Sequence, residues 1–159
     1  ERIEEVRKEW SVIKDNIFVY DSVDVSMDDL NNYCEENEVD IIIIDQLDKI
    51  NIRGNYNAQH EKLKEIYKQA RELAKRNNVL VIGISQAGAE AHNQQRIDFN
   101  WLDNSKTGKA GEADLIIGIG KPRDSDKDYD RWLYLSKNKL TGEHIDIECS
   151  LNHTLSRYE

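Results

Sequence analysis

The sequence has few of the residues that mark disulfide-rich, zinc-binding or membrane proteins. It contains two cysteines and one proline. Cys34 and Cys149 form no C-x-x-C pair and have no histidine pair nearby, so we expect buried free thiols. No apolar run approaches the roughly 20 residues of a membrane-spanning helix, and no signal-peptide pattern opens the sequence. These absences predict an intracellular protein without a membrane partner.

A phosphate-binding loop is also missing. The pattern G-x-x-x-x-G-K-[ST], which cradles nucleotide phosphates in many NTPases, occurs nowhere in the sequence. The nearest approach, KTGKAG at residues 106–111, lacks a preceding strand and the final hydroxyl. Either such a loop lies upstream of this sequence, or a fold of this kind has abandoned catalysis.

Composition is that of an ordinary globular domain, with 38% hydrophobic and 33% charged residues. The net charge of -9 argues against a uniformly basic nucleic-acid binder. However, residues 104–142 hold eight Lys or Arg against six Asp or Glu, whereas residues 1–103 hold thirteen against twenty-one. Positive charge is therefore concentrated late in the chain, although scattered surface charge would explain so modest an imbalance equally well.

Residues 39–50, VDIIIIDQLDKI, contain the strongest strand signal. Four consecutive isoleucines leave no polar position for a solvent-facing side, so we expect a strand buried on both faces of a parallel sheet. Further apolar runs predict strands at residues 17–20, 79–85 and 113–120. Helical periodicity covers residues 3–13, 26–34 with Ser26 as the N-cap, and 58–76. This alternation predicts an α/β fold with a mostly parallel sheet flanked by helices.

The end of the sequence has a different pattern. Residues 129–137 and 143–149 each alternate between polar and apolar side chains, and the segment NKLTG between them contains a glycine. These features predict a C-terminal antiparallel hairpin at one edge of the sheet.

Polar side chains follow two of the predicted parallel strands. Asp45 ends the isoleucine strand, and Gln86 follows the strand at residues 79–85. Because the carboxyl ends of parallel strands lie at one edge of a sheet, we expect both side chains there. A carboxylate can hold Mg²⁺ through its water shell, and an amide can bond a phosphate oxygen or a water. Taken singly, each is equally compatible with a polar residue that starts a turn.

A basic, hydroxyl-rich stretch lies at residues 103–111, DNSKTGKAG. The hydroxyls of Ser105 and Thr107 and the charges of Lys106 and Lys109 suit a nucleic-acid phosphate backbone. Arg96, on the preceding loop, could add a further charge. The alternative is a capped helix start, which is equally plausible from the residues alone.

Lys137 and Lys139 flank Asn138 at the predicted hairpin. Two residues apart on a strand, they point to the same face. They could reach a phosphate on a neighbouring subunit, or could form a solvated edge that discourages strand pairing.

In this order, the features resemble the ATPase domain of DnaB-type replicative helicases, in particular phage-like ones, within the RecA-like family. IIIID resembles the Walker B strand, and LKEIYKQARELAKRNNVLVIGISQ resembles the helix and strand that end in a phosphate-sensing glutamine. NSKTGKAGEADLIIGI is similar to the DNA-contacting loop and the next strand, and SKNKLTG to the hairpin of the basic finger. The resemblance implies that residues 1–159 are one partial RecA-like domain, the C-terminal part of the motor core.

The resemblance also implies roles for the nucleotide-binding residues. Asp45 would support the Mg²⁺ of bound ATP, and Gln86 would sense the γ-phosphate. Lys137 and Lys139 would act in trans on ATP bound to the neighbouring subunit. Bacterial relatives usually have arginine where this chain has Lys139, and lysine keeps the charge without the planar fork.

For DNA, the resemblance implies that Asn104, Ser105 and Thr107, with the adjacent lysines, lie near single-stranded DNA in the channel of a homohexamer. The whole protein would be an ATP-dependent helicase that unwinds duplex DNA by translocating on one strand. It would work in a bacterial cytoplasm or phage-infected host, with a primase or loader as possible partners. The family's phosphate-loop lysine and catalytic glutamate precede these residues, so this fragment alone should not hydrolyse ATP.

Two other interpretations stay open. Recombinase-like or clock-type RecA ATPases share the core, although the basic pair on the hairpin favours the helicase. From a different class, the chain could be a catalytically inactive RecA-like module that binds DNA or an assembly partner.

Overall fold

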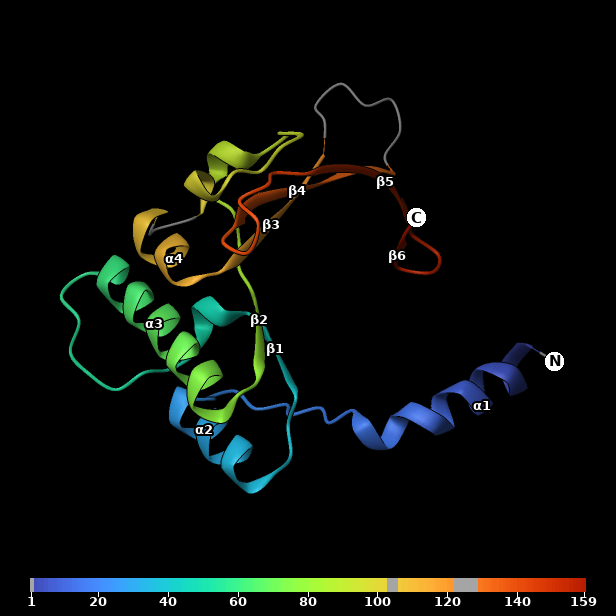
Figure 1. The fold of residues 1–159 in the computed structure, drawn as a ribbon, viewed down its shortest axis with the longest axis horizontal. Helices are drawn as coiled ribbons and strands as arrows, with labels where there is room; N and C mark the ends of the chain where they lie inside the picture. The colour runs from blue at the N-terminus through green and yellow to red at the C-terminus, as the bar shows by residue number, and fades with distance from the viewer. Residues whose placement is uncertain (1, 103–105, 122–128) are drawn as a thin grey trace.

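The computed structural model describes residues 2–102, 106–121 and 129–159. Its helices and strands follow in the order α1 (Arg2–Ile13), α2 (Met27–Glu36), β1 (Ile41–Asp45), α3 (Gln59–Asn77), β2 (Leu80–Ile84), α4 (Lys106–Glu112), β3 (Leu115–Gly120), β4 (Asp130–Asn138), β5 (Asp146–Asn152) and β6 (Arg157–Tyr158). Short 3-10 turns include η2 (Leu47–Lys49) and η4 (Phe99–Trp101). The strands form two sheets, a parallel pair β1–β2 and an antiparallel sheet in the order β3–β4–β5–β6 (Figure 1).

The mixed α/β class and the C-terminal hairpin are confirmed, but the mostly parallel sheet is not. Among the described strands only β1 and β2 run parallel. β3, expected to extend that sheet, instead pairs antiparallel with β4, from Leu115 opposite Asn138 to Gly120 opposite Trp132. An apolar run predicts a strand without specifying its partner or its direction. Here the alternating strand β4 supplies the neighbour.

The helices begin and end where local chemistry predicts. Ser26 caps α2 with a full capping box, because its Oγ accepts from the backbone N of Asp29 while the Asp29 carboxylate accepts from the backbone N of Ser26. The Ser26 hydroxyl also donates to this carboxylate, and these bonds lower the pKa of Asp29. α3 ends at Asn78 in the left-handed region, with φ of 53°.

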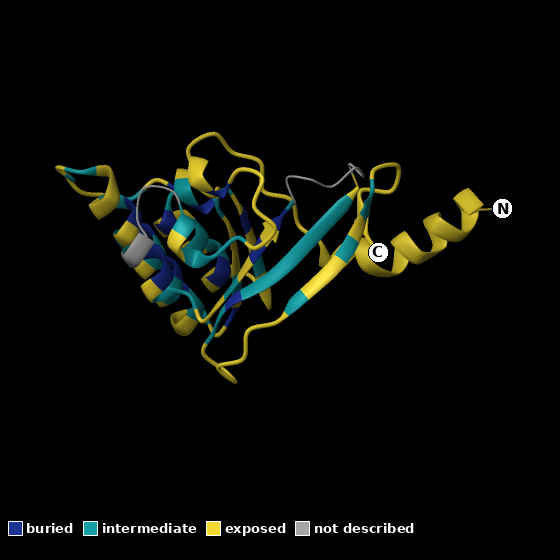
Figure 2. Ribbon diagram, turned by 90° about the horizontal axis from the view of Figure 1, so that it is seen from above, coloured by how far each residue is buried: buried dark blue, intermediate teal, exposed yellow. Residues whose placement is uncertain are grey.

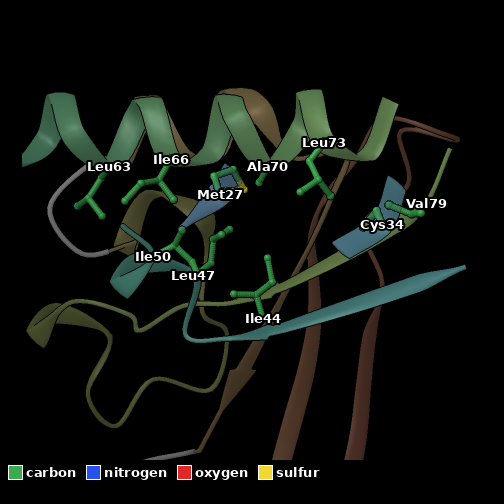
Figure 3. Close-up of a cluster of buried hydrophobic side chains, with 10 residues drawn as sticks. All are labelled: Met27, Cys34, Ile44, Leu47, Ile50, Leu63, Ile66, Ala70, Leu73 and Val79. Carbon is green, nitrogen blue, oxygen red and sulfur yellow. The ribbon is translucent and has the colours of Figure 1, made fainter. Parts of the chain in front are cut away.

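The hydrophobic core lies on one side of the parallel pair. α3 contributes Leu63, Ile66, Ala70 and Leu73, and these pack toward β1, η2 and α2 (Figure 3). Ile44 of β1 is 6% exposed and faces this core. One helical layer therefore covers one face of β1–β2.

The opposite face of the parallel pair is open, which corrects the expectation of a strand buried on both faces. Ile43 is 64% exposed, although its neighbour Ile44 is buried. The same exposed face carries Ile41, Leu80, Ile82 and Ile84. Successive side chains on a strand point to opposite faces, so four consecutive isoleucines place two side chains on each face, and only one face has a partner in this structure.

Residues 17–20 do not form the predicted strand. They are extended without strand pairing, and all four side chains are exposed. An apolar stretch needs a neighbouring strand to take up its backbone N–H and C=O groups. The helix before it, α1, is confirmed but has no buried residue and extends away from the rest of the chain (Figure 2).

Both cysteines are free thiols, as expected. Cys34 is buried, and burial raises its thiol pKa. Cys149 is only partly buried, because it lies on β5, one of whose faces is open to solvent. Among the described residues, the structure contains no helix with the length and apolar character needed to cross a bilayer.

Candidate functional site

The two polar residues predicted for the sheet edge lie at the same edge. β1 and β2 pair in parallel, with Asp45 opposite Ile84. Ser85 and Gln86 follow directly, so the carboxylate of Asp45 and the amide of Gln86 are at the carboxyl ends of adjacent strands, and both residues are exposed. The predicted adjacency is therefore confirmed. An edge of this kind can present an acid and an amide to one ligand.

A second carboxylate near this edge, which was not predicted, lies at the centre of a polar cluster. Asp48 is on η2, three residues after Asp45. Its Oδ2 accepts from the Ser85 hydroxyl at 2.7 Å and from the Lys109 ammonium at 2.9 Å. Its Oδ1 accepts from the Tyr67 hydroxyl at 2.8 Å. Burial and the Asp48 charge raise the pKa of Tyr67 well above its ordinary value, although its hydrogen bond with Ser85 works the other way.

Lys109 is the most unexpected member of this cluster. Its side chain is 1% exposed, on α4, and its ammonium also lies 3.3 Å from the Ser85 hydroxyl and 5.5 Å from the Tyr67 ring centroid. From the sequence we expected it to contact a phosphate backbone. In this conformation the charge is directed inward to Asp48, so that contact remains a prediction. No local pattern identifies the pair, because its members are 61 positions apart.

The two finger lysines hold the C-terminal end of α4. Lys137 donates to the carbonyl oxygen of Ala110, and Lys139 donates to that of Gly111 at 3.2 Å. These are terminal carbonyls of a helix, which lack partners within the helix and carry its partial negative charge. Desolvation and the nearby Lys139 lower the pKa of Lys137.

Asp114 joins Lys139 to α3. Its Oδ1 lies 3.1 Å from the ammonium of Lys139 and 2.9 Å from the guanidinium of Arg71. The Lys139 hydrogen bond, followed by that of Arg71, lowers the pKa of Asp114. Arg71 also donates to the Glu112 carbonyl oxygen. The end of α4 is thus fastened to β4 and to α3 by cations of the same chain.

Arg96, expected to add a charge for DNA, is engaged with β5. Its guanidinium forms a two-point ion pair with Asp146, with Nε 2.9 Å from Oδ1, and lies 5.9 Å from the Tyr134 ring centroid. The segment around it lies across β3, where Gly118 and Gly120 allow its backbone to approach closely. Its contact with DNA remains a prediction.

The other four predicted DNA-contacting residues also remain predictions. Asn104 and Ser105 lie outside the described residues. Lys106 and Thr107 begin α4, and only their backbone belongs to the described part.

The described residues fit a magnesium ion through a single carboxylate. They contain no group of three or more His, Cys, Asp or Glu residues arranged to hold a metal. Mg²⁺ keeps several waters and is commonly bound through one or two carboxylates together with substrate phosphates, so Asp45 at an open edge meets the requirement. A cleft of 250 Å³ beside Asp48, lined on its far side by Tyr56 and Lys62, includes neither Asp45 nor Gln86.

Comparison with known proteins relates this arrangement to one family and one fold. Residues 1–159 match the family described as "DnaB-like helicase C terminal domain". The structure is similar to that of the ATPase domain of a phage helicase, with a TM-score of 0.80 and 16% identity over 90% of this chain. It is also similar to a solved DnaB-like replicative helicase, described together with its interactions with primase, with a TM-score of 0.79 and 16% identity over 90% of this chain.

At 16% identity these two likenesses establish the fold, which is that of a RecA-like ATPase domain. This chain spans 54% of the first structure's chain and 37% of the second. No curated protein matches the sequence.

Proposed function

Because this chain belongs to the DnaB-like helicase C-terminal domain family, we propose that it is the C-terminal part of an ATP-driven DNA helicase motor. Residues 1–159 form one partial RecA-like domain in this proposal. The observation that carries it is the parallel register of β1 and β2, which places Asp45 and Gln86 at one sheet edge. The family match favours this function over a recombinase or clock-type ATPase.

At the nucleotide, Asp45 holds Mg²⁺ through its water shell and Gln86 senses the γ-phosphate of ATP. The metal, when bound, supplies charge neutralisation at the phosphates. The rest of the phosphate cradle comes from another segment of the whole protein, since the sequence contains no phosphate loop. Two observations support this division: the apolar face of β1–β2 is uncovered, and the chain spans 54% of the similar ATPase domain.

At the DNA, residues 103–111 face a single strand in the channel of a homohexameric ring. Asn104, Ser105, Lys106 and Thr107 supply hydroxyl, amide and ammonium groups that bind phosphates without sequence preference. Lys109 and Arg96 are already paired with Asp48 and Asp146, which supports assigning the direct contacts to the other residues. A primase or loader is a further candidate partner, since one of the similar helicases is described with its interactions with primase.

Across the subunit interface, Lys137 and Lys139 serve as the basic finger for ATP bound next door. In this structure both bind α4, and Lys139 also binds Asp114 of its own chain. To reach a neighbouring phosphate, Lys139 must exchange these bonds for bonds to that phosphate. Because its carboxylate partner is exposed, such an exchange costs little.

The test is Asp45→Asn in the full-length protein, assayed for ATP hydrolysis and for unwinding of a forked duplex. We expect both activities to be abolished with little loss of thermal stability, because the carboxylate is exposed at the end of the sheet. Asp40→Asn is the matched control, since Asp40 is an exposed aspartate directly before the other end of the same strand. Normal turnover in Asp45→Asn would refute the metal role, and strand exchange without unwinding by the wild type would favour a recombinase.

A further inference from the structure

The cluster around Asp48 connects four separate segments of the chain through one carboxylate. Lys109 comes from α4, Tyr67 from α3, Asp48 from η2 and Ser85 from the residue after β2. Every described buried side-chain nitrogen or oxygen has a hydrogen-bond partner, so this cluster is fully satisfied. A satisfied polar cluster of this kind fixes the relative positions of the segments that form it.

The position of the cluster relates the two proposed ligands. Asp48 follows Asp45 by three residues, and Ser85 directly precedes Gln86, so both strand ends that carry nucleotide-facing residues enter the cluster. Lys109 lies within residues 103–111, the proposed DNA-facing segment. Its ion pair with Asp48 therefore links that segment directly to the nucleotide edge.

The charge of this pair is hard to explain as a stabilising feature. Two ions buried together lose hydration that their mutual attraction only partly restores, and apolar residues of similar size are often as stable. A buried charge that loses its partner is, by contrast, strongly unfavourable. If η2 or Ser85 shifts with the nucleotide state, α4 has to follow in order to keep Lys109 paired.

We propose that Lys109 is a positioning residue that ties α4 to the ends of β1 and β2, so that the DNA-facing segment moves with the nucleotide edge. The inference rests on the proposed function. Lys109 does not touch the DNA phosphates, because its ammonium is enclosed by Asp48, Ser85 and the Tyr67 ring. Its loss weakens the response of hydrolysis to DNA rather than removing a phosphate contact.

The experiment uses the full-length protein and measures ATP hydrolysis with and without oligo(dT), together with the salt dependence of oligo(dT) binding. The variants are Lys109→Met, Asp48→Asn and the double variant, which contains neither buried charge. Lys68→Met is the matched control, because Lys68 forms exposed ion pairs on α3. Lys106→Ala serves as the reference for a proposed phosphate contact.

We expect Lys109→Met to lower the stimulation by DNA roughly two- to thirtyfold, the range over which single residues change the coupling between two sites. The slope of log Kd against log salt should stay at its wild-type value. In Lys106→Ala the slope should fall by about 0.7, the share of one single-strand phosphate contact. Lys68→Met should match the wild type in both measurements.

The double variant separates positioning from stability. Without an unpaired buried charge it should unfold near the wild-type temperature, yet keep the low DNA stimulation of the single variants. It also carries the test if Lys109→Met does not fold. Wild-type stimulation in the double variant, or a slope in Lys109→Met that falls like that of Lys106→Ala, would overturn the inference. A wild-type protein whose hydrolysis ignores DNA would overturn the proposed function and this inference with it.

Discussion

Lys139 and Asp114 form an ion pair within one chain, with Nζ 3.1 Å from Oδ1. The same ammonium donates to the carbonyl oxygen of Gly111 at the end of α4. A lysine expected to act on a neighbouring subunit is thus held in cis by a carboxylate whose side chain is 55% exposed. Exposed pairs are weak, so this contact can be exchanged for one with a phosphate.

Replacing Lys139 by alanine in the full-length protein should impair ATP hydrolysis, and mixing with wild-type subunits should partly rescue it. The reason is that a finger acts on the neighbour's ATP, so a mutant subunit next to a wild-type one receives an intact finger. The measurement is the hydrolysis rate across mixing ratios. Asp114→Asn is the matched comparison, because it frees Lys139 without removing it and should retain hydrolysis. A Lys139→Ala defect confined to DNA binding would contradict a role in trans.

Asp114 should make stability depend on pH in acid. Its pKa lies below the ordinary value of 3.8 because of bonds from Lys139 and Arg71. A lowered carboxyl pKa stabilises the folded state above the unfolded value, and that contribution is lost as the pH falls through the folded pKa. Asp114→Asn should therefore cost about 0.2–1 kcal/mol at neutral pH, as exposed pairs do. In urea unfolding, this difference should shrink below pH 3.8; an equal loss at all pH values would contradict it.

Gly118→Ala should destabilise the domain by about 1–3 kcal/mol, the usual cost of overpacking. A Cβ at this position in β3 would lie 2.1 Å from the carbonyl oxygen of Ile97, which is backbone and cannot swing away. Gly111→Ala is the control, since nothing lies within 4 Å of its Cβ position. It should be neutral or stabilising, because alanine is favoured over glycine in a helix by about 0.5–1 kcal/mol. Unfolding midpoints compare the two; equal midpoints would place the crossing segment away from β3.

Ile43→Ala should destabilise the full-length protein by about 2–5 kcal/mol, as for a core isoleucine. The reason is the proposed covering of the open face of β1–β2 by another segment, which would bury a side chain that is 64% exposed here. Leu140→Ala, at the exposed hairpin turn, is the control and should change stability by less than about 0.5 kcal/mol. A tolerated Ile43→Ala would mean that this face stays open.

Much of the candidate site follows from short-range patterns. Asp45 and Gln86 could be placed together because each follows an apolar run, and parallel strands bring such ends to one edge. Lys109 could not be placed, because a lysine in a basic, hydroxyl-rich stretch has the same local pattern whether it faces solvent or a buried carboxylate. Arg96 and Asp146, 50 positions apart, illustrate the same limit.

By itself, the sequence determined where the helices and most strands begin and end, since periodicity and the Ser26 cap act over a few residues. It also determined that the last strands form a hairpin. Only the tertiary structure decided that β3 pairs antiparallel with β4, that Ile43 is open while Ile44 is buried, and that Lys109 turns inward to Asp48. These outcomes depend on which distant segment supplies a neighbour, and burial and charge pairing are properties of such contacts rather than of local sequence.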